Sequence, residues 1–107
     1  MDERKFLSLL GMCRKAGKLS CGHDSSVESI RNKKAMLCVF SSDSSDRLRK
    51  EIERECEFAK SPARLLKSDF DMDEIGRASG LRSAVLTVND SGFAQAMLKA
   101  LEIREDD

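Results

Sequence analysis

The sequence has 107 residues, of which 40% are hydrophobic, with one Pro and six Gly. This length supports one hydrophobic core and the composition is globular, so we expect a single domain over residues 1–107 and exclude disordered and fibrous classes. Basic and acidic side chains number 19 each, so the formal net charge is zero and no global field attracts the protein to nucleic acid or to a membrane.

Charge is nevertheless uneven along the chain. Residues 1–35 hold eight basic side chains against four acidic ones, and the remainder carries the opposite excess. An anionic partner that meets the N-terminal third would explain this distribution, and solvated helix faces would explain it equally well. Both explanations stay open at this point.

The N-terminus and the cysteines indicate the compartment. The chain starts with charged residues and lacks the apolar block of a signal peptide, and its longest apolar run, Ala35–Phe40, falls short of the roughly 20 residues that span a bilayer. We therefore expect a cytoplasmic protein. The four cysteines are Cys13, Cys21, Cys38 and Cys56. Because they form no C-x-x-C pair and the chain has one histidine, we expect reduced thiols, no disulfide and no metal site.

The first 22 residues predict a helix followed by a strand. Apolar residues at positions i, i+3, i+4 and i+7 predict a helix over residues 2–16, and Gly17 stands where a left-handed C-terminal cap is expected. Residues 19–21 then form a short strand candidate, which Gly22 ends.

A second helix is expected to end near residue 32. Asp24 or Ser25 can cap its start, and Ser25 with Glu28 has the S-x-x-E spacing of a capping box, in which the glutamate turns back to the backbone of the cap. The continuous apolar run over residues 36–40 then predicts a central strand that is covered on both faces.

The second half of the chain repeats this alternation. It predicts a helix capped by Ser44 or Ser45, a strand over residues 63–66 after Pro62, a short helix over residues 73–78 ended by Gly80, a strand over residues 83–88, and a last helix capped by Asn89, Asp90 or Ser91. Leu48, Ile52 and Cys56 repeat every four residues on an otherwise charged helix. The tail over residues 104–107 is expected to fray. Alternating helices and strands predict an α/β/α sandwich of three layers.

Three motifs suggest chemistry, and each has a simpler structural explanation. The segment from Gly11 to Lys18 looks like a phosphate loop, but its glycine spacing is wrong and Leu19 follows the lysine, so a basic helix C-terminus explains it better. Cys21-Gly-His23 suggests a thiolate beside an imidazole, yet adjacency in sequence does not supply catalytic geometry, and we interpret the histidine as a loop residue. Acidic residues at 69–74 stand at a helix start, so we interpret them as capping rather than metal binding.

Aromatic residues are scarce. There is no Trp or Tyr, and the five Phe fall mostly at core-like positions. A surface that stacks the bases of single-stranded nucleic acid on aromatic rings is therefore not expected. Recognition of folded RNA by backbone and polar groups stays open.

Two blocks of the sequence resemble one family. Leu-Gly-Met-Cys-Arg-Lys-Ala-Gly-Lys-Leu at residues 10–19, followed by Gly22 and by a basic turn before residues 35–39, resembles the small ribosomal proteins of L-seven-Ae and L-thirty-e type. Asp-Glu-Ile-Gly-Arg-Ala-Ser-Gly at residues 73–80, with the strand and helix that follow it, is similar to the E-E-L-G-x-A-x-G block of the same family. The resemblance covers nearly the whole chain and points to the bacterial stand-alone members.

This resemblance implies a four-stranded mixed sheet, no enzymatic activity, no cofactor and a structured RNA partner such as a kink-turn, with ribosomal RNA among the candidates. In the family, the loop after the first strand and the first turn of the second helix approach the RNA, and a loop before the last strand packs on an extruded nucleotide. In this chain the first contact maps to Gly22, Asp24, Ser25 and Glu28, and the second maps to Leu81, Arg82 and Ser83.

The mapped positions depart from the family pattern. Asp24 stands in place of an amide, Ser25 in place of a carboxylate and Glu28 in place of a lysine. The carboxylate of Glu28 repels a phosphate that a lysine would attract. The donors that remain are the backbone N–H groups at the start of the second helix and the side chains of Lys18, Ser25, Ser26, Lys33, Lys34 and Arg82.

Two functional hypotheses follow. The first is a non-enzymatic protein that binds structured RNA through residues 22–28 and the loop at Leu81. The second is a protein of the same fold that lacks kink-turn affinity and binds a protein partner, through the helix of Leu48, Ile52 and Cys56 or its neighbours.

Overall fold

Helices and strands alternate along residues 2–102, which are the residues that the computed structural model describes. In chain order the elements are α1 (Glu3–Lys15), β1 (Leu19–Cys21), α2 (His23–Arg31), β2 (Leu37–Phe40), α3 (Asp46–Ala59), β3 (Arg64–Lys67), α4 (Met72–Ser79), β4 (Val85–Val88) and α5 (Ser91–Ala100). Within this range no helix has the length and apolar content of a membrane span. The tail expected to fray lies outside the described residues.

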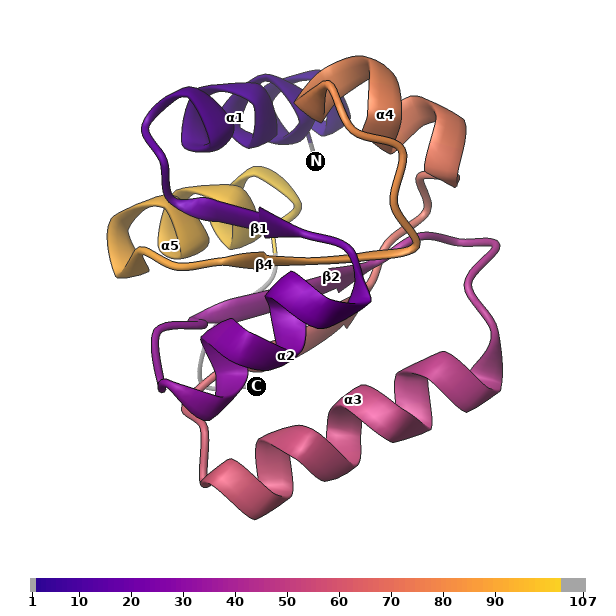
Figure 1. The fold of residues 1–107 in the computed structure, drawn as a ribbon. Helices are drawn as coiled ribbons and strands as arrows, with labels where there is room; N and C mark the ends of the chain where they lie inside the picture. The colour runs from indigo at the N-terminus through magenta and orange to yellow at the C-terminus, as the bar shows by residue number, and fades with distance from the viewer. Residues whose placement is uncertain (1, 103–107) are drawn as a thin grey trace.

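The strands form one mixed sheet in the order β1-β4-β2-β3. Strand β4 is antiparallel to both β1 and β2, whereas β2 and β3 are parallel. Helices α2 and α3 cover one face of the sheet and α1, α4 and α5 cover the other (Figure 1). The predicted three-layer α/β/α sandwich with a four-stranded mixed sheet is therefore confirmed.

A hydrophobic core lies on each face of the sheet, because side chains alternate along every strand. In β2, Leu37 and Val39 join the core beneath α1, α4 and α5, whereas Cys38 and Phe40 join the core beneath α2 and α3. All four side chains are buried, which confirms the prediction of a central strand covered on both faces.

Caps confirm most of the predicted helix boundaries. Gly17 follows α1 with a φ of 72°, the Ser45 side chain caps α3, and the Asp90 side chain caps α5. A capping box lies at the start of α4, where the side chains of Asp71 and Glu74 each accept a hydrogen bond from the other's backbone N–H. These bonds pair donors that the first turn of each helix would otherwise leave unsatisfied.

The predicted start of the second helix is wrong. Helix α2 begins at His23, and its N-cap is Gly22, which makes no side-chain bond. Ser25 and Glu28 therefore lie inside the helix, and the predicted capping box does not form there. The cause is the backbone of Gly22, whose φ of 92° and ψ of 169° turn the chain directly from strand into helix. This combination of angles is essentially restricted to glycine.

The apolar stripe of α3 is buried in the second core. Ile52 is fully buried, Cys56 is 8% exposed, and Leu48 packs against the same cluster. Because this stripe already faces the sheet, the alternative hypothesis, in which it docks a protein partner, is not favoured.

Helix α1 approaches the end of α4 closely, and this contact positions the loop that follows α4. A Cβ added at Gly11 would come within 2.8 Å of the Ala78 carbonyl oxygen. The Arg14 guanidinium donates to the Ser79 carbonyl at 2.7 Å. The C-terminus of α4 is therefore held against α1, and this contact fixes the place where the loop between α4 and β4 begins.

Gly11→Ala should destabilise the protein, although alanine is the better helix former. The added methyl group meets backbone that has to move, and such overpacking typically costs about 1 to 3 kcal/mol, against a gain in helix propensity of roughly 1 kcal/mol. Chemical denaturation gives the free energy of unfolding. Ser8→Ala, at an exposed position of the same helix, is the control and should be neutral or slightly stabilising. Equal or greater stability of Gly11→Ala would contradict the close contact.

Candidate functional site

The two segments that the resemblance assigns to the partner lie side by side at one end of the sheet. Strand β1 is antiparallel to β4, so Cys21 at the end of β1 pairs with Leu86 near the start of β4. The backbone N–H of Gly22 donates to the Val85 carbonyl at 2.9 Å. The turn into α2 therefore lies beside the start of β4, where the loop from α4 ends (Figure 1).

Gly22 leaves open space at this turn. A Cβ added there would meet no heavy atom within 4 Å. Glycine is thus required at this position by its backbone angles and not by packing within the free protein. A ligand can approach the bare backbone closely, because no side chain stands in the way.

The start of α2 exposes hydrogen-bond donors. No side chain caps the helix, and the Ser26 N–H donates to the Gly22 carbonyl at 3.1 Å. The N–H groups of residues 23–25 precede this first backbone hydrogen bond of the helix, and all three residues are exposed. Together with the positive end of the helix dipole, these groups can bind an anion.

The side chains of α2 divide between an exposed and a buried face. Asp24, Ser25 and Glu28 are exposed beside the backbone donors. Ser26 is fully buried, and its hydroxyl has no partner within residues 2–102. The expectation that the Ser26 hydroxyl contacts RNA is therefore wrong, because the helix starts earlier than predicted and turns this side chain inward.

Hydroxyl groups hold α2 on the sheet. The hydroxyl oxygens of Ser20 and Ser29 are 2.8 Å apart, and the Asn89 amide nitrogen donates to the Ser20 hydroxyl at 2.9 Å. This chain of bonds joins α2 to β1 and to the end of β4. The sequence pattern did not indicate it, since serines on a helix are usually exposed.

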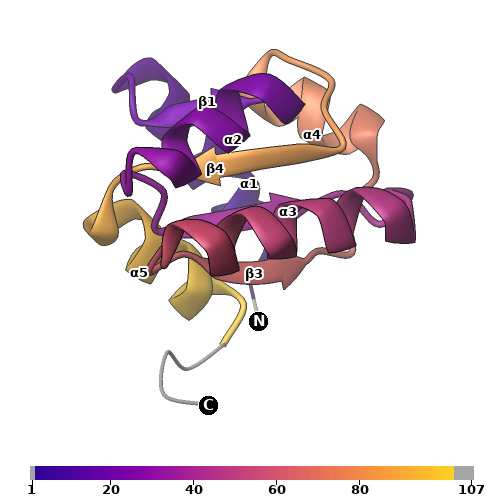
Figure 2. The ribbon, with the colours of Figure 1, turned by 60° about the horizontal axis from the view of Figure 1, so that its bottom comes forward.

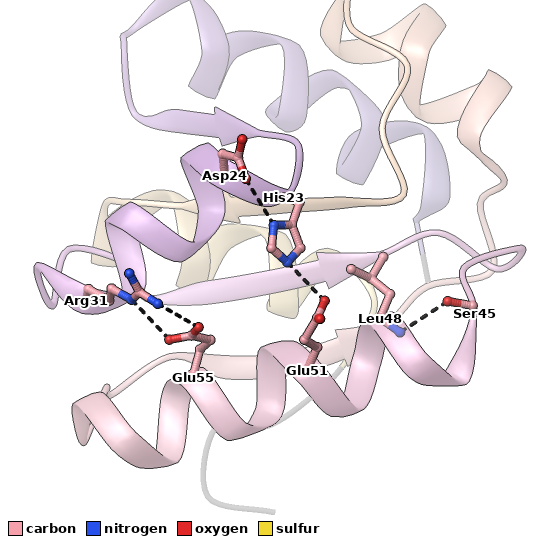
Figure 3. Close-up of polar contacts among 7 residues, drawn as sticks. All are labelled: His23, Asp24, Arg31, Ser45, Leu48, Glu51 and Glu55. Carbon is pink, nitrogen blue, oxygen red and sulfur yellow. Dashed lines mark hydrogen bonds and ion pairs between the residues drawn. The ribbon is translucent and has the colours of Figure 1, made fainter.

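Two polar bridges join α2 to α3 (Figure 3). His23 Nε2 lies 3.0 Å from Glu51 Oε2, while its Nδ1 lies 3.2 Å from Asp24 Oδ1. Near the other end of α2, the Arg31 guanidinium donates to both carboxylate oxygens of Glu55, at 2.9 and 3.1 Å. The bridges hold α2 against α3 along the length of α2.

The same carboxylates raise the pKa of His23. The hydrogen bond to Asp24 has the largest effect, and the hydrogen bond to Glu51 and the charges of both carboxylates add to it against a smaller opposing effect of burial. Protonated His23 brings positive charge to the start of α2, so the charge of this surface changes near neutral pH. The interpretation of His23 as a loop residue is wrong, because it is the first residue of α2.

The loop before β4 presents one apolar and one basic side chain. Leu81 is 47% exposed, and its N–H donates to the Ser79 hydroxyl at 3.2 Å. Arg82 is also exposed, and its Nε donates to the Asp73 carboxylate at 2.6 Å. Ser83 is 7% exposed. Leu81 and Arg82 are therefore the accessible members of the predicted second contact, and Ser83 belongs to the base of the loop.

Three of the predicted contacts lie elsewhere. Lys18 precedes β1, and its carbonyl accepts a hydrogen bond from the Asn89 N–H at 2.8 Å, at the opposite end of the sheet. Lys33 and Lys34 follow the C-terminus of α2, about 13 Å from its start at roughly 1.5 Å per helical residue. The structure does not bring these lysines together with Gly22.

The surface around Gly22 is therefore a set of backbone donors, and it is not a basic patch. Asp24 and Glu28 contribute negative charge, and the charge of Arg82 is partly balanced by Asp73. No group of three metal-ligating side chains comes together in the described part of the chain. This chemistry suits an anionic ligand that is recognised by hydrogen bonds and shape more than by net charge.

Two relatives match this chain over almost its whole length. The RNA-binding protein YlxQ of Bacillus subtilis (strain 168) is 29% identical over 103 residues, which cover 95% of this chain and 100% of that protein. The RNA-binding protein YlxQ of Enterococcus faecium is 28% identical over 101 residues, which cover 94% of this chain and 95% of that protein. Both names denote an RNA-binding protein and not an enzyme.

Solved structures share the fold. A protein with unknown function from Bacillus halodurans C matches with a TM-score of 0.77 and 28% identity over 94% of this chain and 99% of its own. The Giardia lamblia 15.5kD RNA binding protein matches with a TM-score of 0.64 over 92% of this chain and 82% of its own, and at 16% identity it shows a likeness of fold. The model of the Ribosomal protein L7Ae/L30e/S12e/Gadd45 family matches residues 4–98. The chain belongs to this family.

Proposed function

We propose that this is a non-enzymatic, cytoplasmic RNA-binding protein that recognises a kink-turn or a related structured RNA through the start of α2 and the loop before β4. The observation that carries the proposal is the hydrogen bond from Gly22 to Val85, which brings the turn into α2 next to the start of β4, where the loop from α4 ends. Membership of the family and the relatives that are named RNA-binding proteins support it. Ribosomal RNA is the partner that the family name suggests.

Backbone donors make the phosphate contact in this proposal. The N–H groups of residues 23–25 lie beside Gly22, where no side chain hinders a close approach. A helix start binds a phosphate without the help of a basic side chain. Contacts of this kind position an RNA and do not read its sequence, so the shape of the RNA supplies the selectivity.

The loop before β4 supplies the second contact. An unstacked base can pack against Leu81, which is 47% exposed. Arg82 can leave Asp73 to reach a phosphate, because both side chains of this pair are more than half exposed and solvent-screened surface pairs are weak. Lys18, Lys33 and Lys34 are reached only by an RNA helix that extends along α2 to the opposite end of the sheet.

A titration of a fluorescent kink-turn RNA against an unkinked duplex of equal charge tests the proposal. We expect the kinked RNA to bind tenfold or more tightly, a difference of about 1.4 kcal/mol. Measuring both at two salt concentrations separates shape recognition from general attraction to phosphate, which falls steeply with salt. Equal, weak and salt-sensitive binding of both RNAs would contradict kink-turn recognition.

Glu28→Lys should strengthen binding of the kink-turn RNA. The substitution removes a repulsion and adds an attraction on the exposed face of α2, next to the backbone donors. Each interaction is worth roughly 1 kcal/mol at contact distance in water, so the two together amount to roughly 2 kcal/mol and the dissociation constant should fall by about 30-fold. The salt dependence should become steeper by about one unit of the log-log slope, since one more phosphate is neutralised.

Two further variants interpret this result. Glu28→Gln removes the repulsion alone and should give a smaller gain. Glu3→Lys makes the same charge change on α1, which covers the opposite face of the sheet from α2, and should alter the affinity less than Glu28→Lys does. An equal gain from Glu3→Lys would mean that net charge, and not position, sets the affinity.

RNA affinity should rise as the pH falls through the pKa of His23. That pKa lies above its ordinary value of 6.5, so protonation begins near neutral pH and reduces the negative charge that Asp24 and Glu51 place at the start of α2. The bridge from His23 to Glu51 also stabilises the fold, and this contribution depends on pH in the same direction. It is fully present below the pKa that His23 has in the unfolded chain, and it is lost as the pH rises through the higher pKa that His23 has in the folded protein. Binding measured at about pH 5.5 and about pH 8.5 checks this expectation.

His23→Gln is the control for the pH dependence. Glutamine keeps hydrogen-bonding capacity without titrating in this range, so the variant should bind with an affinity that changes little between the two pH values. Because His23 is the single histidine of the chain, its ring signals in an NMR titration report its pKa directly. An affinity of the parent protein that is independent of pH would contradict a role for this charge.

A further inference from the structure

The outer face of α3 carries a row of cations that ends in an aromatic ring. Arg47, Lys50, Arg54 and Phe58 follow one another at intervals of three, four and four residues, which places them along one side of the helix. We call these four residues the α3 stripe. It lies opposite the buried Ile52, and Figure 2 shows α3 on the outside of its layer.

Phe58 is the most unusual member of the stripe. It is 90% exposed, more than any other large hydrophobic residue that the structure describes. The sequence-based expectation that the phenylalanines lie mostly in the core holds for Phe6, Phe40 and Phe70, which are buried. It does not hold for Phe58, so the chain does present an aromatic face to solvent.

Ion pairing leaves the cations of the stripe available. Two carboxylates of α3, Glu51 and Glu55, form the bridges to α2 (Figure 3). Asp46 pairs with Arg49. Within residues 2–102 no ion pair engages the three basic members of the α3 stripe. The charges in the sequence of α3 are mixed, and the tertiary contacts engage Glu51 and Glu55 with α2 while leaving the basic members of the stripe unpaired within the described residues.

Acidic groups do border the stripe. Glu53 and Glu57 flank it on the side away from α2, and Glu51 lines a shallow recess of about 400 Å³ together with Arg47, Lys50 and Arg54. Three cations therefore face three carboxylates, of which one is already engaged by His23. The local excess of available positive charge is modest, so the aromatic ring is needed for specific binding.

The α3 stripe starts near the surface around Gly22. The bridge from His23 to Glu51 brings the start of α2 next to the N-terminal half of α3. From Arg47 to Phe58 the stripe then spans about 16 Å toward the opposite end of the sheet, at roughly 1.5 Å per residue. A nucleic acid strand that leaves the first surface can follow this path.

We infer that the α3 stripe binds a single-stranded segment of RNA, whose phosphates contact Arg47, Lys50 and Arg54 and one of whose bases stacks on Phe58. Spaced cations with an aromatic platform are the general means by which proteins hold single strands, because every base has a flat face that can stack. An acidic protein is a poorer match, since protein interfaces have an apolar centre and Phe58 stands at one end of a charged row. This inference goes beyond the proposed function and does not require it.

Direct binding of a single strand tests the inference. The probe is a fluorescein-labelled dodecamer of alternating adenosine and cytidine, which forms no duplex, titrated with the intact protein at several salt concentrations. Phe58→Ala should weaken binding by at least about fivefold, and Phe58→Tyr, which keeps the ring, should leave it unchanged. The triple variant R47A/K50A/R54A should lower the log-log salt slope by about 2, since each phosphate contact to a single strand contributes about 0.7.

Matched controls separate the stripe from general effects. Lys5→Ala, Lys67→Ala and Lys99→Ala together remove the same charge from exposed positions on α1, β3 and α5, and this variant should retain most of the affinity and slope. Met12→Ala removes an exposed apolar side chain from α1 and should have no effect. Because all these positions are exposed, none of the variants should fail to fold, which circular dichroism verifies.

Three outcomes would overturn the inference. The first is the absence of measurable binding of the dodecamer by the parent protein, and the second is equal loss in the stripe and control variants. The third is equal competition by an acidic peptide together with no effect of Phe58→Ala, which would identify the stripe as a surface for acidic proteins. The kink-turn RNA separates the two proposals: Phe58→Ala should leave its affinity within about twofold of the parent protein. If the protein prefers no kinked RNA but the dodecamer results hold, only the proposed function fails.

Discussion

The backbone turn at Gly22 is the constraint on which the candidate interface depends. Its φ of 92° converts strand into helix without an intervening residue, so α2 starts uncapped and its first N–H groups are exposed. The same residue donates to Val85 and thereby holds the loop before β4 beside the start of α2. A residue with a side chain would pay of the order of 1 to 3 kcal/mol in backbone strain at these angles and would also occupy the space through which a ligand approaches.

Polar contacts between helices decide how charge is distributed on the two-helix face. His23 and Arg31 of α2 engage Glu51 and Glu55 of α3, so these carboxylates point toward α2. The basic members of the α3 stripe lie on another side of the helix, where no ion pair engages them within the described residues, although acidic and basic residues are mixed in the sequence of α3. Surface ion pairs of this kind contribute little to stability, so their importance here is that they orient groups. The single histidine makes one of these bridges sensitive to pH near neutrality.

Much of the fold could be predicted from local patterns, because each element carries its own periodicity. The apolar run of β2, the stripe of α1 and the caps of α3 and α5 are local signals, and the structure confirms each of them. The start of α2 was missed for the opposite reason. Ser25 and Glu28 have the spacing of a capping box, but the tertiary bond from Gly22 to Val85 and the turn at Gly22 start the helix earlier. The outward position of Phe58 was missed because hydrophobic residues are usually buried and its place on α3 relative to the sheet is a tertiary property.

The sequence by itself determined the order of helices and strands, the burial of β2 and the family resemblance, because periodicity and motif spacing are local properties of the sequence. It also determined which residue types stand at the mapped positions, including a glutamate in place of a lysine. Only the tertiary structure decided which of those residues meet. It placed the turn at Gly22 beside the start of β4, placed Lys18, Lys33 and Lys34 at the opposite end of the sheet, and turned Ser26 inward. The reason is physical: pairing of β1 with β4 and packing of α2 on α3 join residues that are far apart in sequence, and no local pattern encodes those contacts.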